Sequence, residues 1–129
     1  MEKILIVEDD ELIAELERDY LEANGFETDI ASDGPSGERM AKAGRYDAVL
    51  LDVMLPGKTG FDVCRELRKT LHLPIIMVTA KKKTLTNTGL GLGADDYLVK
   101  PFSPTELVAR VKSHIHIHSL LLSSPEEQE

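Results

Sequence analysis

Five side chains that could do chemistry together stand directly after short apolar stretches of the sequence. They are three carboxylates, a hydroxyl and an ammonium, in the order Glu8, Asp9, Asp52, Thr79 and Lys100. Carboxylates that converge on one point repel each other, so such a cluster is tolerable only with a cation among them. Oxygen ligands with open positions favour Mg²⁺ or Mn²⁺ over zinc. A hydroxyl and an ammonium nearby could hold the remaining oxygens of a phosphoryl group.

Each of these residues alone also has a simpler structural explanation. A strand-end aspartate such as Asp52 often only caps the next turn, and Thr79 could simply finish a strand. An acidic triplet such as 8–10 favours a helix N-terminus, which is the role we expect for Asp10. The functional interpretation is favoured by the joint occurrence at successive strand ends, because no packing rule requires that combination.

The apolar stretches predict the strands that would bring these side chains together. Unbroken runs of leucine and β-branched residues are typical of strands buried on both faces of a parallel sheet. Such runs occupy 4–7, 48–51, 75–78 and 97–99, and a weaker alternating run occupies 26–31. Helical patterns fill the gaps, so we predict an α/β fold: a doubly wound, five-stranded parallel sheet with five helices. Ligands of such sheets gather beyond the carboxyl ends of the strands.

The helical patterns differ in quality. The first helix has an apolar stripe that we expect to face the sheet, formed by Leu12, Ile13, Leu16, Tyr20 and Leu21. The fourth helix, over 81–93, contains three glycines and three threonines. Because each glycine costs about 1 kcal/mol relative to alanine, we predict a short or irregular helix there.

Composition limits the class of protein. In 129 residues, 15 Lys+Arg against 23 Asp+Glu give a net charge of −8. This segment is therefore not expected to bind nucleic acid by itself, because phosphate binding needs clustered positive charge. The single cysteine, Cys64, fits a reducing compartment, and no apolar run approaches the roughly 18 residues of a membrane span. We expect a cytoplasmic domain over 1–118, without membrane contact, and a linker or tail over 119–129.

Taken together, the motifs resemble the response-regulator receiver domain of two-component signalling, a family with a CheY-like (flavodoxin-like) fold. The resemblance runs from Lys3 to about His118. It is carried by Glu8-Asp9, by 51–56 with Gly60 following, by 78–80 and by 93–102.

The resemblance implies a magnesium-dependent acceptor site. Asp52 would accept a phosphoryl group from the phosphohistidine of a sensor histidine kinase. Mg²⁺ (or Mn²⁺) would be bound by three carboxylates and one main-chain carbonyl, those of Glu8, Asp9, Asp52 and Met54. The family implies a signalling switch and not an enzyme that converts a metabolite, with slow autodephosphorylation as a side reaction.

Further roles follow from the same resemblance. The residues that would contact the phosphoryl group are Thr79, Ala80 and Lys100. Thr79 would switch together with Tyr97, and the Lys100–Pro101 peptide bond would be cis. Two positions that flank the path of the hydrolytic water would tune the lifetime of the phosphoryl group, namely Met54 and Lys81. Because Met54 is apolar, we expect a phosphoryl lifetime longer than that of the fast-cycling motility members of the family.

The segment 94–112 is most similar to the winged-helix, DNA-binding class of the family (OmpR/PhoB type). That class implies a C-terminal output domain after the linker, with DNA bound only through that domain. It also implies a homodimer on phosphorylation, through the fourth helix, fifth strand and fifth helix. The matching dimer-face residues are Asp95, Asp96, Arg110 and Lys112. The fourth-helix segment lacks the usual charged partners, and 113–118 replaces the usual basic end of the last helix, so some dimer bridges cannot form.

Other functions share parts of this pattern. A flavodoxin-like small-molecule binder would need a hydroxyl- and glycine-rich phosphate loop where 8–10 is acidic. An aspartyl phosphatase would need an Asp-x-Asp pair, whereas here the acids are adjacent. A stand-alone receiver, or a receiver-like module that is never phosphorylated, stays open as an alternative. His114 and His118 stand four apart and could share a metal, although ordinary histidines near a helix end are the simpler interpretation.

Overall fold

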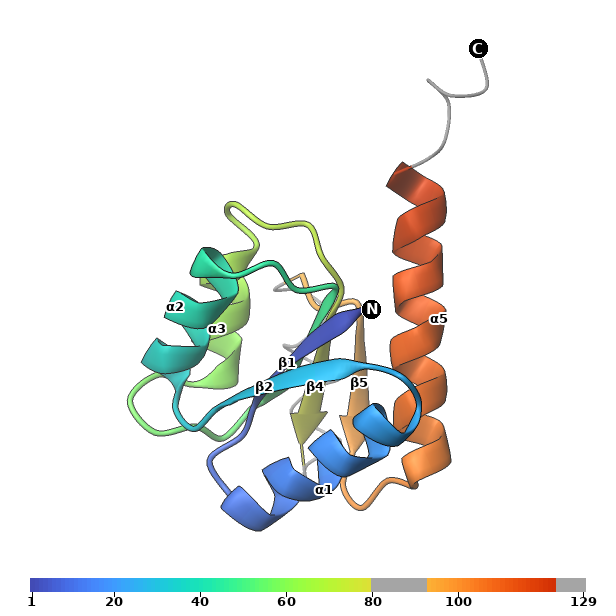
Figure 1. The fold of residues 1–129 in the computed structure, drawn as a ribbon. Helices are drawn as coiled ribbons and strands as arrows, with labels where there is room; N and C mark the ends of the chain where they lie inside the picture. Colours follow the sequence, from blue (N-terminus) through green and yellow to red (C-terminus); the bar gives the residue numbers. More distant parts are fainter. Residues whose placement is uncertain (80–92, 123–129) are drawn as a thin grey trace.

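Five strands form one parallel sheet in the order β2-β1-β3-β4-β5 in the computed structural model, which describes residues 1–79 and 93–122 (Figure 1). The strands are β1 (Lys3–Val7), β2 (Glu27–Ala31), β3 (Ala48–Asp52), β4 (Ile75–Thr79) and β5 (Asp96–Val99). The strand order reverses beside β1, so the chain winds outward in both directions from the β1–β3 pair. The predicted doubly wound parallel sheet is confirmed.

Helices cover both faces of the sheet. The described helices are α1 (Glu11–Ala23), α2 (Gly34–Ala43), α3 (Gly60–Leu67) and α5 (Pro104–Leu122). In Figure 1, α2 and α3 lie together on one face, and α1 and α5 lie on the other. The predicted fourth helix falls almost entirely within 80–92, outside the described residues. Within the described part of the chain, no helix is both long and apolar enough to cross a membrane.

Alternate residues of each central strand enter two separate cores. In β1, Ile4 and Ile6 pack toward α1 and α5, whereas Leu5 and Val7 pack toward α2 and α3. All four side chains are essentially inaccessible to solvent. A strand that is buried on both faces needs an unbroken apolar run, which is the pattern that predicted it.

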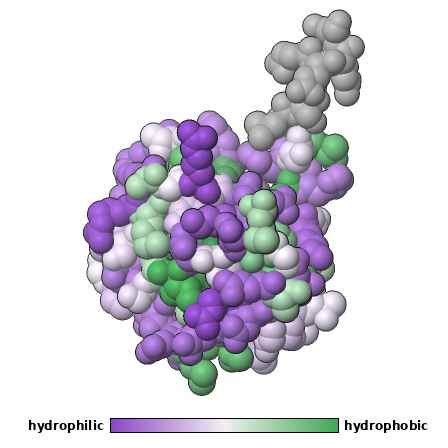
Figure 2. All heavy atoms as spheres, in the orientation of Figure 1, coloured by the Kyte–Doolittle hydropathy of each residue, from purple (hydrophilic) through white to green (hydrophobic). Residues whose placement is uncertain are grey.

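The predicted apolar stripe of α1 was wrong in part. Leu12 is 67% exposed and Leu16 is 44% exposed, while the buried residues are Ala14, Glu17 and Leu21. In Figure 2 the visible face is mostly hydrophilic, with an apolar patch at its lower edge, over α1. Because Ala14 is small, α1 can approach the sheet along its 14–17–21 line, whose spacing of three and four keeps these residues on one face. A carboxylate therefore occupies a core position.

The last helix is longer than predicted. α5 begins after Ser103, whose Oγ accepts a hydrogen bond of 3.0 Å from the backbone N–H of Glu106, as expected of an N-cap. It continues through Leu122, so 119–122, the first residues of the predicted linker or tail, are helical. Leucine is a strong helix former and no proline or glycine interrupts the chain before Pro125, which explains the extension.

Candidate functional site

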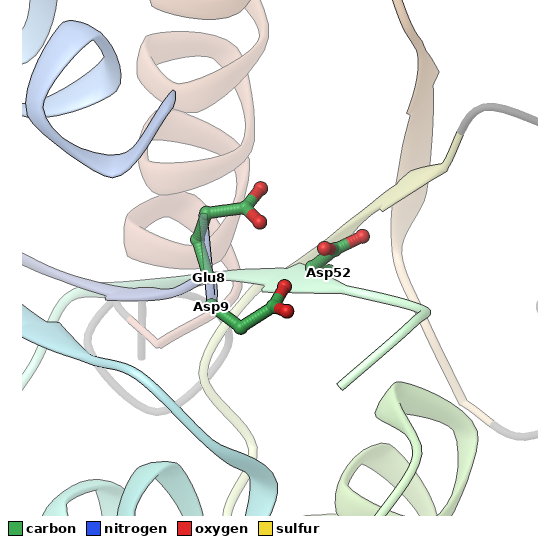
Figure 3. Close-up of side chains that lie close together, drawn as sticks. All are labelled: Glu8, Asp9 and Asp52. Carbon is green, nitrogen blue, oxygen red and sulfur yellow. The ribbon is translucent and has the colours of Figure 1, made fainter. Parts of the chain in front are cut away.

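Three carboxylates meet at the carboxyl ends of β1 and β3. The two strands are parallel neighbours with Val7 opposite Leu51, so the residues that follow emerge side by side. Glu8, Asp9 and Asp52 each offer an oxygen, and these oxygens lie within 4.8 Å of one another (Figure 3). Glu8 and Asp52 are buried and Asp9 is exposed, so the cluster has one side open to solvent. Such a set of hard oxygen donors fits Mg²⁺ or Mn²⁺.

Lys100 supplies the positive charge of the site. Its Nζ donates a hydrogen bond of 2.9 Å to Glu8 Oε1 and lies 3.7 Å from Asp52 Oδ2. Burial opposes its charge, but the hydrogen bond to Glu8 and the charge of Asp52 raise the pKa of Lys100 above its ordinary value. Three ionised carboxylates and one ammonium leave a charge of −2, which a divalent cation would balance.

Backbone hydrogen bonds bring Lys100 to this position. Its N–H donates to the carbonyl oxygen of Thr79 over 2.7 Å, which extends the β4–β5 pairing beyond the end of β5. The Lys100–Pro101 peptide bond is cis.

The acidic triplet after β1 divides between two tasks. Burial raises the pKa of Glu8; the hydrogen bond from Lys100 acts against this, and the neighbouring Asp52 adds to it. Glu8 Oε2 also accepts a hydrogen bond of 3.2 Å from the backbone N–H of Asp10. Asp10 itself caps α1, because its Oδ1 accepts from the backbone N–H groups of Leu12 and Ile13 at 3.0 and 3.2 Å. The predicted cap is confirmed.

The remaining predicted residues lie around this cluster or outside the described residues. Thr79 is the buried last residue of β4, next to the strand that ends in Asp52. Tyr97 on β5 is half-buried against the core on the α2–α3 face, and Met54 is largely exposed. Ala80 and Lys81 fall outside the described residues.

Close packing of Gly60 fixes the backbone at Asp52. The N–H of Gly60 donates to the carbonyl oxygen of Val53 over 2.8 Å, and a Cβ on Gly60 would lie 2.1 Å from the Asp52 carbonyl oxygen. We therefore expect Gly60→Ala to displace the end of β3 and to lower the free energy of unfolding by about 1–3 kcal/mol. Urea unfolding measures this change. An unchanged urea midpoint would contradict this prediction, because the backbone around Asp52 would then accommodate the added methyl group without loss of stability.

Three of the four predicted dimer-face residues make contacts within the chain. Asp96 accepts hydrogen bonds of 2.7 and 2.8 Å from Arg110, and His114 Nε2 lies 2.9 Å from the same carboxylate. Burial raises the pKa of Asp96, but the bonds to Arg110 and His114 outweigh it and the net shift is downward. Asp95 contacts Arg68, and Lys112 is exposed on α5.

Sequence reasoning missed the contact of His114 with Asp96. The four-residue spacing of Arg110 and His114 puts both on one helix face, which was the available signal. Among the described residues, neither His114 nor His118 belongs to a group of three or more possible metal ligands.

Comparison with known families assigns the chain. The family model described as "Response regulator receiver domain" matches residues 4–112. The chain belongs to the response regulator receiver domain family. A receiver domain is a signalling module of two-component systems and not an enzyme that acts on a metabolite.

Related receivers occur in longer proteins. The chain is 47% identical over 115 residues to "DNA-binding response regulator MtrA" of Mycolicibacterium paratuberculosis, and the aligned part covers 88% of this chain and 51% of that protein. MtrA of Mycobacterium tuberculosis is likewise 47% identical, with 50% of its length covered. The chain thus spans about half the length of these relatives.

Solved receiver structures share the fold. The receiver domain of the sensor histidine kinase PA1611 from Pseudomonas aeruginosa, solved with a magnesium ion in its active site cleft, is 33% identical with a TM-score of 0.84. That comparison covers 89% of this chain and 98% of the other. TrrA from Thermotoga maritima, in complex with Mg²⁺ and BeF, is 36% identical with a TM-score of 0.82, covering 88% and 98%. The match to the family model, the curated relatives and the solved structures thus agree on the receiver fold and on membership of the receiver family.

Proposed function

We propose that the chain accepts a phosphoryl group on Asp52 from a sensor histidine kinase, with Mg²⁺ held by Glu8, Asp9 and Asp52. The observation that carries the proposal is the position of Lys100, whose ammonium reaches both Glu8 and Asp52 beside the carboxylate cluster. A structural salt bridge would need only one carboxylate. Three carboxylates with one ammonium suit a site that must take up a divalent cation and then a dianion.

The chemistry is an in-line exchange of one bond for another. An oxygen of the Asp52 carboxylate attacks phosphorus, and the bond from phosphorus to the imidazole nitrogen of the phosphohistidine breaks. Lys100 offsets the negative charge of the group in transfer, and its raised pKa keeps it protonated at neutral pH. Mg²⁺, when bound, would offset the remaining charge on the carboxylate and phosphoryl oxygens. The carbonyl oxygen of Met54 would complete its protein ligands.

The response to phosphorylation would start at the end of β4. Thr79 would move toward the new phosphoryl oxygens, and Tyr97 on the adjacent β5 would follow into the space vacated. Such a change shifts the population between two packings and is driven by a local charge. Ala80 would leave room for the group, and Met54 and Lys81 would set how long it persists.

The output of the switch would be transcription. The relatives are named DNA-binding response regulators. By analogy, a DNA-binding output domain would follow the linker or tail of this chain. Phosphorylation would favour a homodimer through the predicted fourth helix, β5 and α5, with the Asp96–Arg110 pair rearranged. The single cysteine fits a cytoplasmic location.

Incubation with acetyl phosphate and Mg²⁺, followed by intact mass measurement, tests the acceptor role. We expect an adduct of one phosphoryl group that is absent when the metal is chelated and absent in Asp52→Asn. Asp62→Asn, which removes a carboxylate on α3 that pairs with Arg65, is the matched control and should keep the adduct. A wild-type chain that stays unmodified at every Mg²⁺ concentration would contradict the proposal and favour a module that is never phosphorylated.

A further inference from the structure

Glu17 is a buried carboxyl group to which the phosphoryl-acceptor mechanism assigns no task. It lies on the sheet-facing side of α1 and is 2% exposed, and within the described part of the chain its Oε2 has no hydrogen-bond partner. A buried polar atom without a partner costs on the order of 1–3 kcal/mol, more if the group is charged. Packing alone therefore does not explain a glutamate at this position.

Glu17 and Lys100 line the same cavity. The cavity has a volume of about 230 Å³ and lies between α1 and the turn that follows β5. Its walls are mostly apolar and include Tyr20 and Phe102. Lys100 therefore contacts Glu8 and Asp52 at the strand ends and shares this cavity with the carboxyl group of Glu17.

The surroundings keep Glu17 protonated at neutral pH. Burial is the main cause that raises the pKa of Glu17 to about 8; the charge of Glu8 adds to the shift, Lys100 opposes it and Asp52 adds to it. The charged groups that act on Glu17 thus come from the ends of β1, β3 and β5, and Tyr20 is the titratable neighbour on its own helix. Lys100 stays cationic throughout this range, because its own pKa is raised.

We propose that Glu17 is a positioning residue for Lys100: as a carboxylate it competes with Glu8 and Asp52 for the ammonium, and as a neutral acid it leaves Lys100 to the phosphoryl site. The geometry that supports this is the shared cavity, the complete burial of Glu17 and the long, flexible side chain of lysine, whose ammonium has three donors. The effect on phosphorylation rests on the proposed function, whereas the coupling of the two side chains does not.

The coupling is tested directly by nuclear magnetic resonance of the metal-free chain. The Cε–Hε signals of Lys100, assigned from their loss in Lys100→Arg, should shift through a transition near the pKa of Glu17, about 8. Glu17→Gln keeps the shape of the side chain but cannot ionise, so the transition should vanish. Asp19→Asn removes an exposed carboxylate of the same helix and should retain it. A transition that persists in Glu17→Gln, or none in the wild type, would overturn the proposal.

The consequence for the site is tested with acetyl phosphate and Mg²⁺. Wild type and Glu17→Gln should be phosphorylated at equal rates at about pH 6, and the variant severalfold faster at about pH 9. If Glu17 had a purely structural role, the ratio of the Glu17→Gln rate to the wild-type rate would be the same at every pH. Such a constant ratio would count against positioning. If no variant is phosphorylated, the proposed function fails, and the pH dependence of the Lys100 signals in the metal-free chain still decides whether Glu17 acts on Lys100.

Discussion

Lys100→Ala is expected to slow the phosphorylation of Asp52 by acetyl phosphate by roughly a hundredfold to a thousandfold, the usual cost of losing one preorganised group that stabilises developing charge. Lys100 Nζ is the ammonium that lies 3.7 Å from Asp52 Oδ2, and its charge would otherwise offset that of the incoming group. Intact mass measurement of the adduct against time gives the two rates.

The same substitution should affect the fold less than the reaction. Glu8 loses the hydrogen bond of 2.9 Å from Lys100, and the expected loss is about 1–3 kcal/mol of unfolding free energy, limited because Glu8 can take up a proton. Lys69→Ala removes an exposed lysine beyond the end of α3 and is the control for charge, with wild-type rates expected. Phosphorylation of Lys100→Ala at the wild-type rate would contradict the role that we assign to the lysine.

The residues at the strand ends were predictable because two patterns coincide there: apolar runs that mark strands, and carboxylate, hydroxyl and ammonium side chains that directly follow those runs. Unbroken apolar runs locate the parallel strands, and parallel strands bring their carboxyl ends to one edge of the sheet. The proximity of Glu8, Asp9 and Asp52 then follows from strand order, without knowledge of any side-chain conformation. The positions 80–92 had the weakest helical pattern in the sequence, and the prediction for them stays a prediction.

Side-chain contacts between elements were less predictable. The rotation of α1 depends on how closely Ala14 approaches the sheet, and hydrophobicity alone favoured Leu12 and Leu16 as core residues. Burial of a glutamate in place of a leucine has no signature in an apolar pattern. The contact of His114 with Asp96 likewise depends on where α5 lies against β5, which spacing along one helix does not determine.

Glu17→Leu is expected to stabilise the fold, and the gain should grow with pH. Leucine has a similar volume and no polar atoms, so it removes both the buried oxygen without a partner and the ionisable group. Between the ordinary pKa of a glutamate, 4.5, and the folded value of about 8, the folded wild type binds more protons at Glu17 than the unfolded chain does. Wild-type stability therefore decreases as pH rises through this range.

The pH dependence gives this prediction its sign and its size. Below about pH 4.5 Glu17 is protonated in both the folded and the unfolded state. There, Glu17→Leu should raise the free energy of unfolding only by the cost of burying a neutral carboxyl group without a hydrogen-bond partner, about 1–3 kcal/mol. The gain should then increase by several kcal/mol up to about pH 8, at roughly 1.4 kcal/mol for each pKa unit of difference, and stay constant above it. Urea unfolding of both proteins across this range measures the difference.

The shape of that curve also separates burial from ion pairing. If Lys100 turns toward the ionised Glu17, the pair recovers part of the lost stability, and the plateau above pH 8 is lower than burial alone would produce. In the double variant Glu17→Leu with Lys100→Ala, this recovery is absent, so the two substitutions should be non-additive above pH 8 and closer to additive below pH 4.5. Asp19→Asn removes an exposed carboxylate of the same helix that pairs with Arg18, and it is the control for the loss of one acidic side chain from α1. A gain for Glu17→Leu that does not change with pH would mean that Glu17 has the same pKa in the folded and the unfolded chain, and would contradict the shift on which this prediction rests.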